Sequence, residues 1–423
     1  MVLDHLLEKA FTVSGLSGTL RVVTVSGRRF RAGDGDGPTA TIRFADAAAE
    51  RELLLDPELK FGELFTDGRL ILESGSLPDL MTVLLGRNRG EPSLRQMRAL
   101  TALRRLGRRV AGRNTLLRAR RNVERHYDLD GRLYALFLDA DRLYSCAYYA
   151  TPGMSLEEAQ AAKMRHIAAK LLAGPGQRVL DIGCGWGALG LYLAGVAGCS
   201  SVRGITLSAE QQRVAQARAA ERGLSGRVRF TLEDYRTLHG TFDRIVSVGM
   251  FEHVGPAHYD TFFRNAHDRL AEDGVMLLHT IGRTGVPWPT NPWITRYIFP
   301  GGHLPTLSEM MPAIERAGLM LADVEVLRLH YAETVRDWRT RFLVHRDEAA
   351  ALYDERFCRM WEWYLASAEA AFRYEDAVVF QLQLTRRNDV VPLTRDYIAE
   401  AEARLRRVEE EAERGMGPMR AAG

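Results

Sequence analysis

The segment Val179-Leu-Asp-Ile-Gly-Cys-Gly-Trp-Gly187 gives the first indication of how this 423-residue chain folds. An apolar run that contains Asp181 is followed by glycines at 183, 185 and 187, and an apolar helical pattern begins directly after them. Glycines let a backbone turn tightly between a strand and a helix and approach a ligand closely. The segment therefore predicts a strand, a turn and a helix, with a small-molecule site at the turn.

On the C-terminal side of this segment, short apolar runs alternate with helical patterns. Such alternation builds a mostly parallel sheet that is covered by helices on both faces. We expect an α/β, doubly wound sheet with a helical insertion before its last strand. The expected strands are 178–182, 202–206, 228–232, 244–248, 275–281, 321–329 and 377–385, and the expected helices are 188–196, 209–222 and 258–271, with an aromatic-rich helical stretch over 334–374.

The N-terminal part of the chain has a different character. Short alternating runs at 20–25 and 40–44 are separated by Gly-Asp-Gly-Asp-Gly-Pro at 33–38, which predicts a smaller α+β domain. Between 93 and 121, ten arginines are interleaved with apolar residues, as in an amphipathic basic helix or helix pair. That segment is either a solvated linker or a surface that meets anionic phospholipid headgroups.

The composition is that of a globular protein without a membrane span. Apolar residues make up 46% of the chain, and no apolar run approaches the about 18 residues that a spanning helix needs. Asp4, Glu8 and Lys9 interrupt the leucines of residues 1–20, which show no export signal, so a cytosolic location is expected. The four cysteines are widely spaced, which speaks against a disulfide framework or a structural zinc site.

The glycine turn points to one class of cofactor. It lacks the Gly-x-Gly-x-x-Gly spacing of dinucleotide-binding enzymes, and Asp181 precedes it within the strand. This pattern resembles class I methyltransferases, and the resemblance implies that the glycines contact the amino-acid part of S-adenosylmethionine. Residues after the next two strands would face the same crevice. The expected cofactor-binding residues in these segments are Asp181, Gly183, Gly185, Gly187, Thr206, Leu207, Gln211, Asp234 and Tyr235.

Some of these residues have simpler explanations. Ser208 is a good helix N-cap, and Gln211, three residues later, would complete a capping box with it. Asp234 and Tyr235 could belong to an ordinary surface turn.

Five further motifs resemble the cyclopropane-fatty-acyl-phospholipid synthases and, in part, the related mycolic acid cyclopropane synthases. The resemblance runs in order from about Asn122 to Arg387. The motifs are Asn122-Val-Glu-Arg-His-Tyr-Asp128, Tyr144-Ser-Cys-Ala-Tyr148, Arg244-Ile-Val-Ser-Val-Gly-Met-Phe-Glu-His-Val-Gly255, Leu277-Leu-His-Thr-Ile-Gly282 and the segment 293–300.

The resemblance implies an enzyme that adds a methylene group from S-adenosylmethionine to an acyl-chain double bond, with bound bicarbonate as the base. The residues implied to hold bicarbonate are Glu252, His279 and Tyr331, with backbone groups of Cys146 and Ile281. Tyr144 and Ser145 resemble cofactor contacts, and Tyr127 and Asp128 would help to close the site. Taken without the resemblance, Glu252 could simply bond backbone amides, and His279 could be a satisfied core histidine.

The implied chemistry makes its own demands on the site. An isolated alkene is a poor nucleophile, so the methyl donor must be held in line with it in a dry pocket, with a base within reach. Aromatic residues at 288–299, together with Trp338, Phe342, Trp361, Trp363 and Tyr364, could line an acyl channel, although core packing explains most of them singly. Many relatives carry a reactive cysteine where this chain has Ala368, which excludes covalent cysteine chemistry from that position.

The implied domain organisation follows the same resemblance. We expect a lipid- or membrane-associated domain at 1–92, an arginine-rich helical linker at 93–121, a catalytic domain at 122–390 and a charged helical tail at 391–423. The expected partners are an unsaturated phospholipid, the inner face of the cytoplasmic membrane and a second copy of the chain, with no nucleic acid.

Three alternatives remain open. Loss of a proton from a neighbouring chain carbon would leave a methyl- or methylene-branched chain in place of a ring. Arginine-rich segments also attract nucleic acid, but the Asn/Asp-Pro-Pro-aromatic turn of amine methyltransferases is replaced here by Met250-Phe-Glu-His-Val254. A lipid-binding protein on an inactive scaffold would be expected to lack the glycines or Glu252, and both are present.

Overall fold

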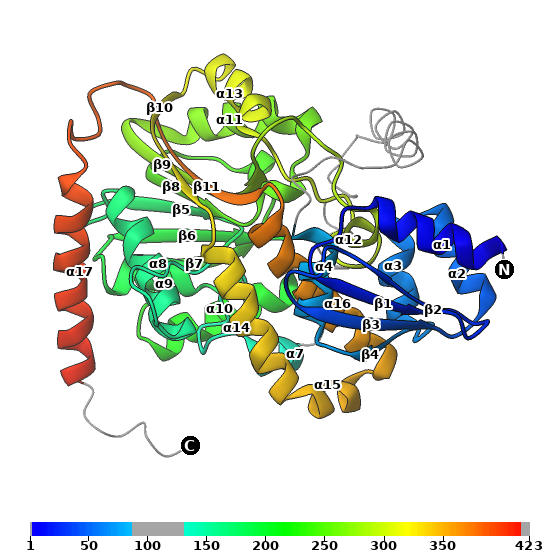
Figure 1. The fold of residues 1–423 in the computed structure, drawn as a ribbon. Coiled ribbons are helices and arrows are strands. Elements are labelled where there is room, and N and C mark those ends of the chain that lie inside the picture. Colours follow the sequence, from blue (N-terminus) through cyan, green and yellow to red (C-terminus); the bar gives the residue numbers. More distant parts are fainter. Residues whose placement is uncertain (1, 87–130, 416–423) are drawn as a thin grey trace.

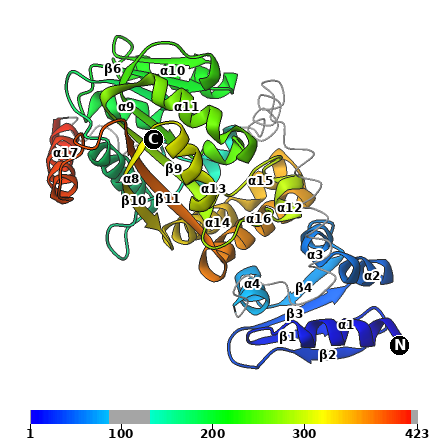
Figure 2. The same ribbon diagram turned by 90° about the horizontal axis from the view of Figure 1, so that it is seen from above.

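The computed structural model of the protein describes residues 2–86 and 131–415 (Figure 1). The arginine-rich segment predicted at 93–121 lies outside these residues, as do Tyr127 and Asp128. The N-terminal region lies at one end of the molecule, and the C-terminal helix α17 (Asp396–Gly415) lies at the opposite end (Figure 2).

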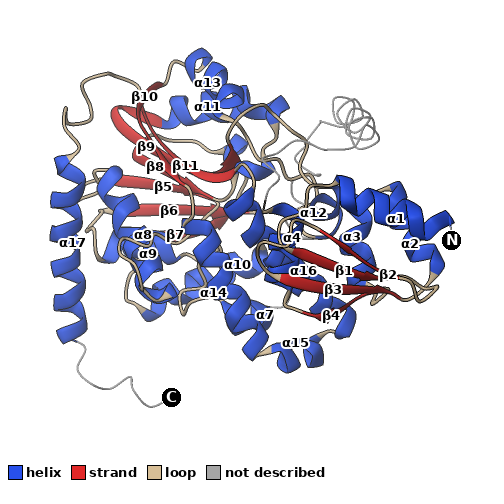
Figure 3. Ribbon diagram, in the orientation of Figure 1, coloured by secondary structure: helices blue, strands red, loops and turns tan. Residues whose placement is uncertain are grey.

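A seven-stranded sheet forms the centre of the larger region, in the order β10-β11-β9-β8-β5-β6-β7 (Figure 3). Strand β11 runs antiparallel to its two neighbours, and the other strands are parallel to one another. The predicted doubly wound α/β sheet is therefore confirmed. The strands are β5 (Arg178–Ile182), β6 (Ser201–Thr206), β7 (Val228–Leu232), β8 (Phe242–Val248), β9 (Leu270–Arg283), β10 (Met320–Leu327) and β11 (Ala377–Thr385).

Helices cover both faces of this sheet because its strands are apolar on both sides. Successive strand residues point to opposite faces, so Val246 packs in one buried cluster and its neighbour Ile245 in the other. One face carries α8 (Leu156–Lys170), α9 (Ala188–Gly195) and α10 (Ala209–Glu221). The other face carries α11 (Tyr259–Arg269) and α13 (Leu307–Arg316).

The helical insertion before β11 is present, but it is not one continuous stretch. It consists of α14 (His330–Val344), α15 (Arg346–Leu352) and α16 (Glu355–Tyr374). The break before α16 has a local cause: Asp354 is extended, and its side chain accepts a hydrogen bond from the Phe357 amide, which makes it the N-cap of a new helix.

The N-terminal region is a small α+β unit, as predicted. Its sheet has the order β2-β1-β3-β4. The strands are β1 (Thr19–Val23), β2 (Arg29–Ala32), β3 (Thr39–Phe44) and β4 (Leu70–Ser74), and the helices are α1 (Val2–Val13), α2 (Ala47–Leu55), α3 (Pro57–Thr66) and α4 (Leu77–Leu85).

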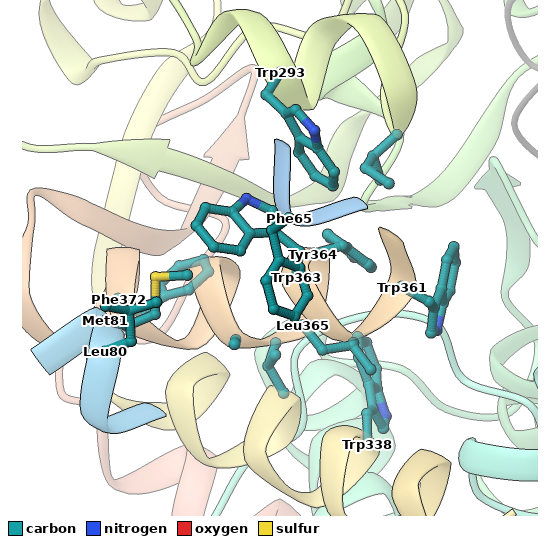
Figure 4. Packing of buried hydrophobic residues seen from close by; sticks show 14 of the residues in the cluster. Phe65, Leu80, Met81, Trp293, Trp338, Trp361, Trp363, Tyr364, Leu365 and Phe372 are labelled. Atoms are coloured by element: carbon teal, nitrogen blue, oxygen red, sulfur yellow. The ribbon is translucent and has the colours of Figure 1, made fainter. Parts of the chain in front are cut away.

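Aromatic side chains join this unit to the larger region. Trp363 of α16 lies between Phe65 of α3 and Trp293 of α12 (Pro292–Tyr297) (Figure 4). Gly62 is required at this contact, because a Cβ atom there would lie 2.7 Å from both indoles. The N-terminal unit and the helical insertion thus share one hydrophobic core.

Within residues 2–86 and 131–415, no helix is both long enough and apolar enough to cross a bilayer.

Candidate active site

The glycine turn after β5 forms one wall of a cleft at the carboxyl ends of the parallel strands. Gly183, Gly185 and Gly187 all have positive φ, at 85°, 53° and 87°. Around Gly185 a Cβ atom would meet nothing within 4 Å, whereas at Gly187 it would lie 2.7 Å from Phe230. Gly183 and Gly185 both line the cleft, but only Gly185 faces open space, because a Cβ atom at Gly183 would lie 2.7 Å from Met250. Gly187 does not line the cleft and lets α9 pack against β7.

Asp181 supplies a buried carboxylate to this cleft. Its Oδ2 atom is buried without a hydrogen-bonding partner among the described residues. Burial raises the pKa of Asp181 from 3.8 to about 7. An unpaired oxygen at such a site calls for a donor from a ligand, and the amino and hydroxyl groups of S-adenosylmethionine are suitable donors.

Thr206 and Gln211 lie together in the cleft wall beyond Asp181. The hydroxyl of Thr206 donates to Gln211 Oε1 at 2.8 Å, and it accepts from the Ser208 amide at 3.1 Å. Ser208 is the N-cap of α10, as predicted. The predicted capping box is wrong, because the Gln211 side chain bonds to Thr206 and not to the Ser208 backbone. Leu207 lies beside them in the same wall.

Asp234 and Tyr235 complete the cleft at its far side. Asp234 caps a short 3-10 helix (Tyr235–Thr237) and receives two hydrogen bonds from the Arg236 guanidinium, at 2.8 and 2.7 Å. Tyr235 packs edge-on against Phe262. These contacts fix both residues at the cleft, so they are more than an exposed surface turn.

A second and larger cavity meets this cleft. Its volume is about 1480 Å³, which exceeds the usual range for small-molecule pockets. It extends from the end of β9 to α1 and α4 of the N-terminal unit, and Trp293, Tyr364 and Ala368 are among its lining residues. The residues common to the two spaces are Tyr144, Ser145, Gly249 and His253.

Glu252 lies in the wall of the larger cavity, on a short 3-10 helix (Phe251–His253) that follows β8. Its Oε1 atom accepts a hydrogen bond from the Ile281 amide at 2.6 Å. Its Oε2 atom is buried, and no other described residue bonds to it. Burial raises the pKa of Glu252 from 4.5 to about 7, so this carboxyl can be neutral near neutral pH and donate a hydrogen bond.

His279 lies on β9, two residues before Ile281, and also lines the larger cavity. Its Nδ1 atom is 3.2 Å from Nε2 of Gln381 on β11. An amide that donates to Nδ1 leaves the imidazole proton on Nε2. Burial, with nearby lysines, lowers the pKa of His279 to about 3, so the ring is neutral.

Tyr331 and Cys146 complete the predicted set in the same cavity. The ring of Tyr331 is held by Trp338 and Phe372, at centroid distances of 5.7 and 4.8 Å. Cys146 is buried, and burial raises the pKa of its thiol to about 12, so it is not a nucleophilic thiolate. The structure thus brings Cys146, Glu252, His279, Ile281 and Tyr331 to one cavity.

The junction of the two spaces is aromatic. Tyr144 stacks on Trp338 at a centroid distance of 5.1 Å, and its hydroxyl lies 2.8 Å from that of Tyr364. Trp361 packs edge-on against Tyr364. Trp338 and Trp361 are not among the cavity-lining residues and serve as core behind the junction.

Sequence reasoning missed Lys163, a buried residue of α8 that lines the cofactor cleft. Its Nζ atom donates to Ser145 Oγ at 2.8 Å. The Ser155-Glu158 capping box gives a signal for the helix itself. On that helix, a lysine that follows the small residues at 159–162 could have been noted as a candidate, although its burial could not be predicted from the sequence.

Comparison with known proteins relates this geometry to a family. A family model described as mycolic acid cyclopropane synthetase matches residues 114–382. The cyclopropane-fatty-acyl-phospholipid synthase of Escherichia coli K12 is 45% identical over 261 residues, which cover 62% of this chain and 66% of that enzyme. The match thus spans just under two thirds of the relative's own length. The tuberculostearic acid methyltransferase UfaA1 of Mycobacterium tuberculosis is 38% identical over 87% of this chain and 88% of the relative.

A solved structure of the same family is also similar to this chain. The mycolic acid cyclopropane synthase CmaA1, complexed with SAH and CTAB, matches with a TM-score of 0.60 and 35% identity, over 63% of this chain and 97% of that chain. The predicted class I methyltransferase fold is therefore confirmed.

Proposed function

The chain belongs to the mycolic acid cyclopropane synthetase family, and we propose that it converts the double bond of an unsaturated phospholipid acyl chain into a cyclopropane ring. S-adenosylmethionine would be the source of the added carbon. The observation that carries this proposal is the junction of a cofactor cleft with a long cavity whose walls hold Glu252, His279 and Tyr331.

The cleft residues suit S-adenosylmethionine. Bound in the cleft, the cofactor would supply an electrophilic methyl group, and the π electrons of the alkene would form the new C–C bond while the C–S electrons stay on sulfur. Gly185 allows a close approach of the ligand to the backbone, and Asp181 offers an acceptor for the amino-acid or ribose part. The shared wall at Tyr144 and Gly249 would bring donor and alkene together.

The aromatic junction has a second role in this proposal. Methyl transfer leaves a positive charge on the other alkene carbon, and that carbon must not meet water before the ring closes. Tyr144 and Tyr364 border the cavity at this point, and aromatic faces stabilise nearby positive charge.

Ring closure requires removal of a proton from the added methyl group, and we assign the base to bicarbonate. The chemistry that bound bicarbonate supplies is an oxygen that accepts this proton while the C–H electrons close the ring. Neutral Glu252 and neutral His279 can each donate a hydrogen bond to an oxyanion, and the Tyr331 hydroxyl is a third donor. The unpaired Oε2 atom of Glu252 is the feature of this structure that best fits such a ligand.

A phospholipid substrate fits the shape and the rim of the cavity. The cavity reaches the apolar residues Leu7 and Phe11 of α1 and Leu84 of α4, which would receive an acyl chain. Leu55 and Val286 line the same cavity and are each 74% exposed. Exposed apolar side chains at a rim are suited to contact with a bilayer surface, so we propose peripheral membrane binding. A homodimer is proposed from the family resemblance alone.

A second candidate is alkylation of the same double bond to a branched chain. It is favoured by the relative with the more extensive match, UfaA1, whose name describes a tuberculostearic acid methyltransferase. The cofactor cleft and the alkene cavity would serve both reactions. The two reactions differ in the carbon that loses the proton: the added methyl group for a ring, and a neighbouring chain carbon for a branched chain.

Incubation with S-adenosylmethionine and vesicles of a monounsaturated phospholipid tests the proposal. Mass spectrometry is expected to find that each modified chain gains the mass of one methylene group. The rate should fall in bicarbonate-free buffer and recover when bicarbonate is added. Unmodified lipid, with methylation of a nucleic acid or a small amine, would overturn the proposed function.

A further inference from the structure

Helix α8 carries two fully buried lysines, of which one has an acidic ion-pair partner among the described residues and the other does not. Lys163 is 1% exposed and Lys170 is 0% exposed. They lie seven residues apart, about two helical turns, on the same face of the helix. Lys170 is paired with Glu325 on β10, with 3.0 Å between Nζ and Oε2. Lys163 has no carboxylate within ion-pair distance among the residues that the structure describes.

No carboxylate of the described residues forms an ion pair with Lys163, although the charge of Asp139 offsets part of the effect of burial on its pKa. In the part of the chain that the structure describes, its Nζ atom has one hydrogen-bonding partner, the neutral Ser145 hydroxyl. The acidic residue nearby is Asp139, whose oxygens accept from the backbone amides of Asp141 and Leu143 and which makes no ion pair with Lys163. Burial lowers the pKa of Lys163 to about 8, and it raises that of Asp139, so neither charge is well accommodated.

Lys163 lies where an anion could reach it. It lines the cofactor cleft, and Ser145, its partner, borders both the cleft and the larger cavity. Its charge also acts on Cys146 and His279 in that cavity. A buried charge is costly unless it is paired, so a cation held at a ligand site implies that the ligand carries the counter-ion.

We propose that Lys163 is an anion-binding residue that pairs with a carboxylate-type group brought in by a ligand of the reaction site. The two sources of such a group are the amino-acid carboxylate of the cofactor and bicarbonate. The inference rests on the proposed function for the identity of these ligands, but the first arm of its test measures ligand binding without any alkylation.

The test compares ligands with and without the carboxylate. Calorimetry measures the binding of S-adenosylhomocysteine and of 5′-methylthioadenosine, which has the same nucleoside and thioether but no amino acid. K163M is expected to weaken S-adenosylhomocysteine binding by about tenfold to a hundredfold, the loss expected for a hydrogen bond to a charged group, with 5′-methylthioadenosine unaffected. This outcome identifies the cofactor carboxylate.

The second arm addresses bicarbonate. If S-adenosylhomocysteine binding is unchanged in K163M, the bicarbonate concentration that gives half-maximal alkylation should rise by a similar factor. The proposal is overturned if neither quantity changes, or if both nucleosides lose affinity equally, because the latter indicates general damage to the cleft.

K170M is the matched control on the same helix. It removes a buried ammonium group that already has its counter-ion. It should therefore lower the melting temperature, without weakening S-adenosylhomocysteine binding more than 5′-methylthioadenosine binding. K163M should leave the melting temperature unchanged or raise it, because it removes an unpaired buried charge. A selective loss in K170M equal to that in K163M would also overturn the proposal.

Discussion

Glu252 and the Ile281 amide are joined by a 2.6 Å hydrogen bond that leaves the second carboxyl oxygen of Glu252 buried and unpaired within the described structure. The bond fixes the orientation of the carboxyl group in the cavity wall. Because Ile281 and His279 belong to the same strand, the bond also sets Glu252 relative to His279. The arrangement explains how a short 3-10 helix and a strand can present two neutral side chains to one cavity.

Substitution of Glu252 is expected to affect turnover far more than cofactor binding. E252Q keeps an acceptor for the Ile281 amide but changes the group that faces the proposed bicarbonate. Turnover should fall by about a hundredfold or more, the usual range for loss of general acid–base assistance, while S-adenosylhomocysteine affinity is retained. Steady-state kinetics and calorimetry measure the two quantities.

D243N is a suitable control, since Asp243 lies at the opposite end of β8 and pairs with Arg178. It should retain normal turnover. Equal activity of E252Q and the native chain would contradict the role assigned to Glu252.

Glu252 also predicts how stability depends on pH. Its pKa is raised in the folded protein from 4.5 to about 7, so between these values the folded state binds a proton that the unfolded state has lost. Stability should therefore decrease as pH rises through this window, by about 3 kcal/mol for this one group. E252Q should lose that decrease and become more stable than the native chain above the window. Urea unfolding across this pH range measures the difference, and parallel curves would argue against the raised pKa.

Two glycines of the same turn should respond differently to substitution. Both have positive φ, so alanine strains the backbone at either position. Gly185 borders open space, so G185A should add to this strain only a loss of S-adenosylhomocysteine binding, by about tenfold or 1.4 kcal/mol. At Gly187 an added Cβ atom would lie 2.7 Å from Phe230 and 2.8 Å from Ala215. G187A should therefore destabilise the fold by more than the about 1–3 kcal/mol of backbone strain, and by more than G185A, because of this overlap. Calorimetry measures the binding and thermal unfolding measures the stability of both variants. A larger loss of stability in G185A than in G187A would contradict this view.

The exposed apolar rim predicts where the protein meets a bilayer. The double variant L55D/V286D places two charges at the cavity rim and should reduce sedimentation with phospholipid vesicles. L393D is the control, because Leu393 is fully exposed but does not line the cavity. Equal vesicle binding by both variants and the native chain would exclude this rim as the contact. Binding that weakens as salt increases would further support a role for the arginine-rich segment at 93–121.

Much of the larger sheet could be predicted because its strands are short apolar runs between clear turn signals. Strands β5, β7 and β11 have the predicted limits. Helix α8 was not predicted, since most of its residues are buried and it lacks the polar face that marks an amphipathic helix. The insertion was predicted as one stretch because the break at Asp354 depends on a single capping side chain.

The site could be predicted in its residues but not in its shape. Glu252, His279 and Tyr331 are distant in sequence, and only the family resemblance connected them. The capping-box rule failed at Gln211, whose side chain accepts a hydrogen bond from Thr206 in place of the predicted bond to the Ser208 backbone. That Lys163 bonds to Ser145 and makes no ion pair with a carboxylate of the described residues depends on how α8 packs against the segment before it, and no local pattern records it.

The most direct test follows the added carbon itself. The protein is incubated with vesicles of a monounsaturated phospholipid and S-adenosylmethionine that is ¹³C-labelled in its methyl group, and the recovered lipid is analysed by ¹³C NMR. We expect the label to appear as the CH₂ carbon of a cyclopropane ring. A label found as a methyl or exocyclic methylene carbon would contradict ring formation, and a lipid without label would contradict the account as a whole.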